Sequence, residues 1–204
     1  MYKIAIIGAG GINSWTIKNL TEMFVKLDIT DYLLTIFDND IVEEKNIINQ
    51  NQNFQAEDVM DGKAESLAKK YAVMFKNQLI TEENIDCLDN YNVIILGVDN
   101  NKARKMIYQY ALDKNKYLLD MKAQGTQISY IVLEHTKGME YYNNKYFNNE
   151  EVMERKGSCQ LQKDIDNNHV EMGNYIIACL GINACLLKHI RNEKPSTFEW
   201  RFAY

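Results

Sequence analysis

The chain has 204 residues, of which 46% are hydrophobic, so it is long enough for one α/β domain with a buried core and short for two. Its formal net charge of -5, without a basic cluster, argues against a surface that neutralises nucleic-acid phosphates. The first strand pattern begins at residue 2, no apolar run reaches the roughly 18 residues of a membrane span, and the cysteines form no CxxC pair. We therefore expect a single cytoplasmic domain over residues 1–204, without nucleic-acid or membrane partners, disulfides or a four-thiolate zinc site.

The first elements are a strand, a glycine turn and a helix. Residues 2–7 are almost continuously apolar, which is typical of a parallel strand covered on both faces. Gly8, Gly10 and Gly11 then allow a sharp turn and the close approach of a ligand to the backbone. Residues 12–27 have a helical apolar face, so the free N–H groups of this helix point back at the turn. This arrangement predicts an anion site, most often for a phosphate.

A second strand, at residues 32–37, ends at Asp38 and leads into a long polar segment that reaches residue 54. The segment has neither a helical nor a strand period, and loops longer than about a dozen residues in compact domains are usually functional or disordered. It follows the carboxyl end of a parallel strand, where open α/β sheets bind ligands. We therefore interpret it as a functional loop.

The remaining elements continue the alternation of strands and helices. The pattern predicts a helix at 62–75, strands at 78–80 and 93–98, a helix after Asp99 and Asn100, and strands at 117–121 and 128–133. Residues 135–168 are polar and form a crossing segment, compatible with a short helix at 149–155, whereas residues 172–190 are apolar on nearly all sides. With a terminal strand at 198–204, the predicted fold is α/β: a Rossmann-like, doubly wound, mostly parallel sheet with a C-terminal crossing segment and a buried helix.

Four motifs occur in order between residues 2 and 133: GAGGINS, FDNDIVEEKNIINQ from Phe37, GKAESLA around Lys63, and DNNKAR from Asp99. In order and spacing they resemble the ThiF/MoeB/HesA family of ubiquitin-activating-enzyme-like adenylyltransferases. Further on, KGSCQLQKDI and GNYIIACLGINACLL look similar to ThiF-like proteins of the plasmid and phage type.

The resemblance implies an ATP-dependent enzyme that activates the C-terminal carboxylate of a small ubiquitin-like or sulfur-carrier protein, or of a peptide, as an acyl adenylate. It also implies Mg²⁺ and a homodimer. Asp38 would bind both ribose hydroxyls, Lys63 would bring a positive charge to the phosphates, and Asp99 would hold the metal. The other residues that the resemblance places at the nucleotide are Gly8, Gly10, Gly11, Asp40, Asn46, Gln50, Asn100 and Arg104.

Two departures from the family pattern leave other functions open. Asn49, or Asn51 in a shifted register, stands where the family's loop normally carries an arginine, and no arginine-bearing helix precedes the first strand. Arg155 or Arg191 would have to compensate, or the chain is a degenerate member that binds a nucleotide or a partner protein without catalysis. A nicotinamide-dependent oxidoreductase is a third alternative, disfavoured because Asn13 stands where the GxGxxG fingerprint has its third glycine.

Among the four cysteines, Cys159 is the one in a polar setting and the candidate to accept the acyl group as a thioester. Neighbouring cations such as Lys156 would lower its thiol pKa, although a loop cysteine without function is the alternative. Cys179 and Cys185 lie on the apolar helix and are expected in the core, and nothing in the sequence assigns a role to Cys87.

Overall fold

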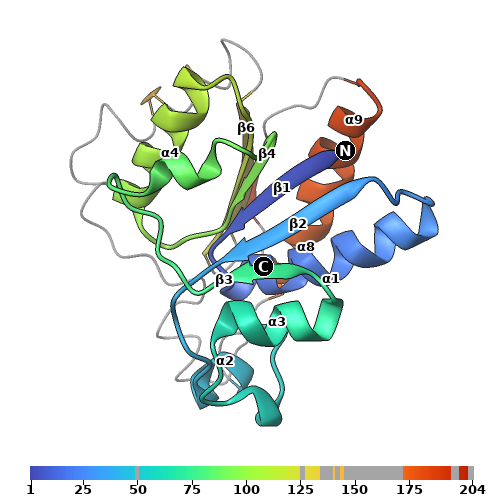
Figure 1. Ribbon diagram of the computed structural model, residues 1–204, viewed down its shortest axis with the longest axis vertical. Helices are drawn as coiled ribbons and strands as arrows, with labels where there is room; N and C mark the ends of the chain where they lie inside the picture. The colour runs from blue at the N-terminus through green and yellow to red at the C-terminus, as the bar shows by residue number, and fades with distance from the viewer. Residues whose placement is uncertain are drawn as a thin grey trace.

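A computed structural model describes residues 1–48, 51–124, 127–133, 140, 143–144, 172–193 and 198–201 of the chain. It contains a seven-stranded sheet with the strand order β3-β2-β1-β4-β5-β6-β7 (Figure 1). The pairs among β1 to β5 are parallel, whereas β6 and β7 are antiparallel to their neighbours, which confirms the predicted Rossmann-like, mostly parallel sheet. The strands are β1 (Tyr2–Ile7), β2 (Tyr32–Phe37), β3 (Met74–Lys76), β4 (Val93–Leu96), β5 (Tyr117–Gln124), β6 (Gln127–Leu133) and β7 (Phe198–Arg201).

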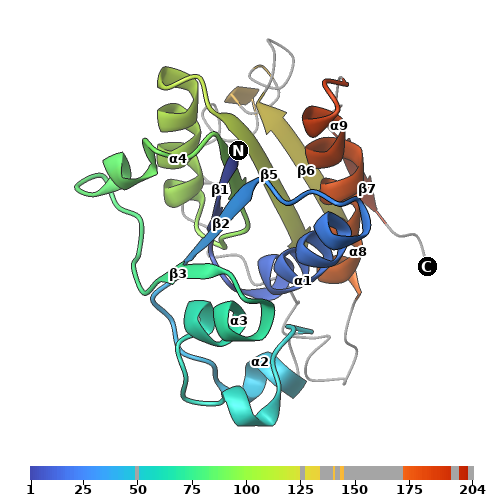
Figure 2. The same cartoon turned by 45° about the vertical axis from the view of Figure 1, so that its right-hand side comes forward.

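Helices cover both faces of the sheet (Figures 1 and 2). Helices α1 (Gly11–Lys26), α3 (Lys63–Tyr71) and α8 (Gly173–Gly181) contribute to one apolar cluster with Ile4 and Ile6 of β1. Helix α4 (Asn101–Asp113) contributes to a second cluster with Ala5 and Ile7. Successive residues of a strand face opposite sides, so β1 needs apolar residues at every one of these positions, which explains its continuous hydrophobic run.

The helix predicted at 62–75 ends earlier than expected. Ala72 adopts a left-handed conformation with φ of 53°, and α3 therefore stops at Tyr71. The chain then turns into β3, which pairs with Thr35 to Phe37 of β2. The helical prediction was wrong at this end because pairing with the sheet overrides the local pattern. Residues 78–80, which the structure describes, do not form the predicted strand. The strand at this edge of the sheet is β3.

The described parts of the long polar segment after β2 are folded. It contains the short helix α2 (Glu44–Ile48), and a 3₁₀ turn, η1 (Ala56–Asp58), precedes α3. The part of the segment that begins at Asn51 is hydrogen-bonded to α1. The Nε1 of Trp15 donates to the carbonyl of Asn51 at 2.8 Å, and the backbone N–H of Asn53 donates to Oγ of Ser14 at 3.0 Å. The absence of a clear period had predicted no element here, but tertiary hydrogen bonds hold the loop.

The apolar run after residue 172 forms three consecutive helical pieces, α8, the π-helical η4 (Ile182–Leu186) and α9 (Leu187–Ile190). A Cβ on Gly181 would lie 2.4 Å from Sδ of Met121, so glycine lets α8 lie close against β5. By length and composition Gly173–Ile190 could cross a membrane, with a mean hydropathy of 1.2, which corrects the expectation that no run reaches this length. In the structure it packs on the sheet and α1, as the predicted buried helix does. The predicted helix at 149–155 lies outside the described residues.

Candidate functional site

The sheet changes winding direction between β1 and β4, which are adjacent strands. The turn after β1 leads to α1 on one face, and the turn after β4 leads to α4 on the other. The two turns touch, because the N–H of Gly97 donates to the carbonyl of Ile7 at 3.1 Å. Open α/β sheets bind ligands at this topological switch point, so both turns are candidates for a site.

The glycine turn leaves open space at the start of α1. Gly8 has φ of +85°, a conformation that favours glycine, and its N–H donates to the carbonyl of Phe37 at 2.9 Å. Gly10 is the N-cap residue of α1, which has no side-chain cap, and a Cβ at this position would meet no atom within 4 Å. The first N–H groups of the helix thus border open space. The turn is therefore compatible with the predicted phosphate site.

Asn13 occupies the place of the third glycine in the dinucleotide fingerprint. Its Nδ2 donates to the carbonyls of Ile7 and Gly8 at 3.0 and 2.8 Å, and the residue is fully buried. The amide therefore closes the β1 turn from inside the protein.

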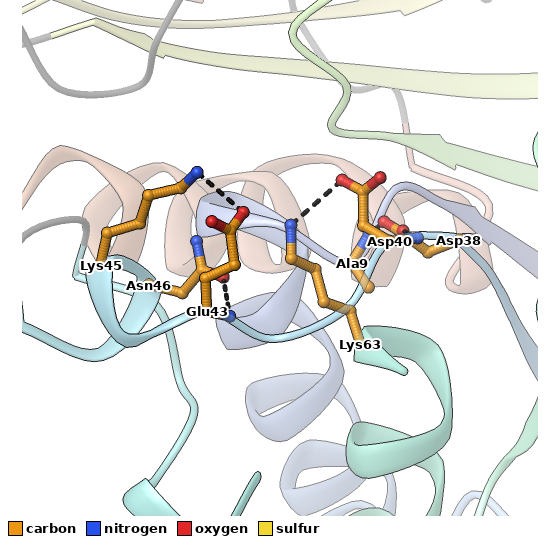
Figure 3. Close-up of polar contacts among 7 residues, drawn as sticks. All are labelled: Ala9, Asp38, Asp40, Glu43, Lys45, Asn46 and Lys63. Atoms are coloured by element: carbon orange, nitrogen blue, oxygen red, sulfur yellow. Dashed lines mark hydrogen bonds and ion pairs between the residues drawn. The ribbon is translucent and has the colours of Figure 1, made fainter. Parts of the chain in front are cut away.

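Asp38 joins the glycine turn to the long loop (Figure 3). Its carboxylate accepts hydrogen bonds from the N–H of Ala9 at 2.6 Å and from the N–H of Asp40 at 2.7 Å. Burial raises the pKa of Asp38, an effect that the two hydrogen bonds and the charge of Lys63 oppose. The predicted ribose ligand is thus a partly buried acceptor, fixed by the turn that would hold the phosphates.

Lys63 stands beside Asp38 at the first position of α3. Its N–H donates to the carbonyl of Asp40 at 2.8 Å, and its ammonium lies 3.1 Å from Oδ2 of the same residue (Figure 3). The lysine side chain is 10% exposed and that of Asp40 is 65% exposed. The ammonium of Lys63 thus lies close to the glycine turn. Its partner is an exposed carboxylate, which phosphates would displace at a small cost in free energy.

Asn46 shapes the loop from within. It is 1% exposed, and its Oδ1 accepts a hydrogen bond from the N–H of Glu43 at 2.8 Å (Figure 3). These contacts support the backbone, and a contact of Asn46 with a nucleotide stays a prediction. Gln50, the neighbouring predicted site residue, lies outside the described residues.

Asp99 and Asn100 form the turn after β4, and both are exposed. Asn100 caps α4, because its Oδ1 accepts hydrogen bonds from the N–H groups of Lys102 and Ala103 at 2.8 and 3.3 Å. No group of three or more metal-ligating side chains occurs among the described residues. A magnesium ion at Asp99 would need phosphate oxygens and water as further ligands, which is the usual arrangement for Mg²⁺.

Arg104 lies inside the protein, between α4 and β5. Its guanidinium forms an ion pair with Asp120 and donates to the carbonyls of Val98 and Met121, with 3.2 Å to the latter. Arg104 is 3% exposed and Asp120 is 1% exposed. The structure thus gives Arg104 a place that supports the turn, and its direct role at a ligand stays a prediction. Asp120 was not predicted as part of this arrangement, although it is the one carboxylate within the strand sequence YLLDM.

Arg191, one of the two arginines that could compensate for the loop arginine, does not lie at the candidate site of its own chain. This residue follows α9, and the hydroxyl of Tyr2 contacts the carbonyl of Ile190 at 3.4 Å, so Arg191 lies near the amino end of β1. The candidate site is at the opposite, carboxyl ends of the strands. Arg155 and Cys159 lie outside the described residues.

Two other cysteines are partly buried. Burial raises the pKa of the Cys87 thiol, so it forms less thiolate at neutral pH than an exposed cysteine. Cys179 accepts a hydrogen bond from Nδ2 of Asn19 at 3.2 Å, which places it between α8 and α1. The setting of Cys87 is therefore not that of an activated nucleophile.

A doubly wound sheet, a glycine turn before an uncapped helix and an acidic end of the second strand place the chain in the class of Rossmann-like α/β proteins. The chain belongs to the ThiF family, whose model matches residues 1–202.

Solved structures of two proteins share the fold. PaaA is 17% identical, with a TM-score of 0.66 and coverage of 98% of this chain and 73% of PaaA. MccB from E. coli, solved with MccA-N7isoASN, is 15% identical with a TM-score of 0.68, and its complex with AMPCPP and MccA gives 0.67. This chain covers 64% and 63% of the MccB chain in these two structures, somewhat less than two thirds of its length. A search of curated protein sequences found no match.

Proposed function

We propose that this protein is an ATP-dependent adenylyltransferase, which activates the C-terminal carboxylate of a small protein or peptide as an acyl adenylate. The observation that carries the proposal is the hydrogen bond from Ala9 to Asp38, which joins an acidic strand end to an open helix start. Lys63 lies next to this contact and supplies a positive charge. The residues that we propose for ribose, phosphate and charge neutralisation thus lie near one another, which supports the proposal.

Each residue has a distinct task in this reaction. Asp38 accepts hydrogen bonds from ribose hydroxyls, and the N–H groups at the start of α1 donate to phosphate oxygens. Lys63 stabilises negative charge that develops at the phosphates as the substrate carboxylate attacks and pyrophosphate leaves. Mg²⁺, held by Asp99 together with the phosphates, would supply further charge neutralisation.

The substrate class is proposed from the structural neighbours. MccB was solved with MccA and with AMPCPP, an ATP analogue. These complexes favour a peptide or a small ubiquitin-like or sulfur-carrier protein with a free C-terminus as the substrate here. We also propose that the chain is one domain that acts as a cytoplasmic homodimer.

A degenerate protein that binds nucleotide without catalysis is the second candidate. The specific observation in its favour is Asn49 at the position of the family's loop arginine, because loss of one transition-state donor costs on the order of 3 kcal/mol. Such a protein would still bind ATP through Asp38 and the glycine turn.

Calorimetry with ATP and with NAD, each in the presence of Mg²⁺, tests the nucleotide. We expect ATP to bind, no useful affinity for NAD, and weaker ATP binding in Asp38→Ala. Pyrophosphate exchange with candidate C-terminal peptides then separates the two proposals, because a purely binding protein gives no exchange. Micromolar affinity for NAD with none for ATP would refute both.

A further inference from the structure

Asp120 lies inside the sheet, next to the strand that leads into the turn of Asp99. It belongs to β5, and its register partner is Leu96, the last residue of β4. The chain leaves β4 through Gly97 and Val98 and reaches Asp99 three residues after Leu96. Asp120 is 1% exposed, so its carboxylate can affect a ligand at this edge only through a neighbouring residue.

That neighbour is Arg104 of α4, which is itself buried. Its Nη1 donates to Oδ1 of Asp120, and its Nη2 donates to the carbonyls of Val98 and Met121. The guanidinium is planar and its donors have a fixed geometry, so the bond to Asp120 also sets the direction of Nη2. The ion pair thus connects β5 to the residue directly before Asp99.

The turn that carries Asp99 is held at both ends. At its start, the N–H of Gly97 donates to the carbonyl of Ile7 at 3.1 Å. At its end, Asn100 is the N-cap residue of α4. Between these two points lies the carbonyl of Val98, which accepts the hydrogen bond from the guanidinium. The backbone on the amino side of Asp99 is therefore fixed from inside the protein, although Asp99 itself is exposed.

We propose that Asp120 is a positioning residue for the carboxylate of Asp99. Asp120 orients Arg104, which holds the carbonyl of Val98, and the turn then keeps Asp99 in one place. The proposal rests on the proposed function, in which Asp99 and the phosphates of ATP bind Mg²⁺ together. Mg²⁺ requires a nearly ideal octahedral geometry, so a single carboxylate on an exposed turn contributes fully only if its backbone is fixed. Asp120 therefore increases the affinity for ATP only when Mg²⁺ is present, and it touches neither of them.

The test compares the affinity of each protein for ATP in EDTA with its affinity in Mg²⁺, both measured by calorimetry. The ratio of the two dissociation constants is the gain from the metal, and a purely structural role would not change this ratio in folded protein. The charge-neutral variant Arg104→Met with Asp120→Leu should fold, because replacing both partners leaves no unbalanced charge. We expect it to bind ATP in EDTA within about threefold of wild type and to lose about tenfold of the gain from Mg²⁺.

Three further variants identify the cause of that loss. Arg104→Lys keeps the positive charge beside Asp120 but not the fixed fork of donors, so it should lose about tenfold of the gain as well. Asp120→Asn keeps an acceptor oxygen for the arginine and should stay within about threefold of the wild-type gain. Lys114→Met is the matched control, because Lys114 is the C-cap residue of α4 and forms an exposed ion pair with Asp89. It should leave the gain unchanged.

Several results would overturn the proposal while the function stands. If Asp99→Ala abolishes the gain from Mg²⁺ but both Arg104 variants keep it, the turn does not depend on the ion pair. Weaker binding of ATP in EDTA in these two variants would show that Arg104 contacts the phosphates directly. An equal loss in Asp120→Asn would show that the oriented hydrogen bond is not the cause. An equal loss in Lys114→Met would attribute the effect to the general charge of α4.

A second measurement separates the proposal from the proposed function. If the wild type binds no ATP, the function fails, and hydrogen exchange in the free protein tests the positioning alone. We then expect the backbone N–H groups of Asp99 and Asn100 to exchange about tenfold faster in Arg104→Met with Asp120→Leu, and that of Ala9 in the glycine turn to be unchanged. Unchanged exchange at Asp99 and Asn100 would overturn the positioning role as well.

Discussion

The side-chain amide of Asn13 occupies the space in which any side chain larger than hydrogen at Gly97 would have to lie. A Cβ on Gly97 would be 2.7 Å from both Cγ and Nδ2 of Asn13. The amide cannot move away freely, because its two hydrogen bonds hold it to the end of β1. The large side chain at residue 13 in one turn of the switch point is therefore accommodated by the glycine at residue 97 in the other.

This relationship predicts the result of a double-mutant cycle. Gly97→Ala should destabilise the protein by about 1–3 kcal/mol through overpacking, and Asn13→Ala by about 1–2 kcal/mol through the loss of two hydrogen bonds. The double variant should lose less than the sum, because Asn13→Ala removes the clash. Urea denaturation of the four proteins measures the coupling. Additive losses would show that the two side chains do not compete for one space.

The buried pair of Arg104 and Asp120 predicts a large effect on stability. Arg104→Met should cost about 3–5 kcal/mol, because it leaves the carboxylate of Asp120 buried without its cation. Arg104→Met with Asp120→Leu should recover part of the loss, since no unbalanced charge remains. The midpoint of urea denaturation is the measurement. If Arg104→Met were as stable as wild type yet inactive, a direct role at the ligand would be favoured.

Lys63 and Asp99 predict a loss of activity without a loss of fold. Lys63→Ala and Asp99→Ala should abolish pyrophosphate exchange, while the free energy of unfolding stays within about 1 kcal/mol of wild type. The reason is that the partner of Lys63 is an exposed carboxylate and that Asp99 is itself exposed. Lys69→Ala, on the same helix with a side chain 64% exposed, is the matched control and should keep full exchange. Full exchange in either site variant would reject the assigned roles.

The missing loop arginine predicts opposite outcomes at two positions. Asn49→Arg should raise ATP affinity or the exchange rate if the site is a weakened version of the family's. Asn51→Arg should instead lower stability by about 1–2 kcal/mol, because residue 51 has φ of 46°, where asparagine is better tolerated than arginine. Exchange assays and urea denaturation of both variants are the measurements. A gain of activity in Asn51→Arg alone would assign the arginine position to residue 51.

The hypothesis that Cys159 accepts the acyl group predicts a thioester that forms only when this cysteine is present. Incubation with ATP and the cognate partner should give a conjugate that reductant removes and that Cys159→Ala abolishes. Cys87→Ala is the control and should keep the conjugate, because burial raises the thiol pKa of Cys87 and makes it a poorer nucleophile. Electrophoresis with and without reductant gives the answer. Exchange without any conjugate would limit the protein to adenylation.

The elements that the sequence predicted well are those with a long, local period. The apolar run Tyr2–Ile7 predicts a central strand, because burial on both faces requires apolar side chains at successive positions. The glycine turn predicts the start of the helix, because its backbone freedom comes from adjacent residues. Strand β3 was missed, because three exposed residues, Met74 to Lys76, have no pattern of their own and form a strand only by pairing with β2.

The candidate site was predictable where motifs are local. Asp38 and Lys63 lie together as the family motifs implied, since strand end and helix start meet at one edge of the sheet. Asp120 was not found, because its significance depends on its contact with Arg104 across the fold. Periodicity carries no information about such pairs.

Gly10 differs from Gly8 and Gly97, because neither the space around it nor its backbone conformation requires a glycine. Gly8 is required by its φ of +85° and Gly97 by a neighbouring amide, whereas Gly10 has room for a side chain and no unusual backbone angle. A serine or aspartate there would cap α1 and stabilise it relative to an uncapped start. The same side chain would compete with an incoming phosphate for the helix N–H groups. If the turn binds a phosphate as proposed, thermal stability and ligand affinity favour different residues at this position.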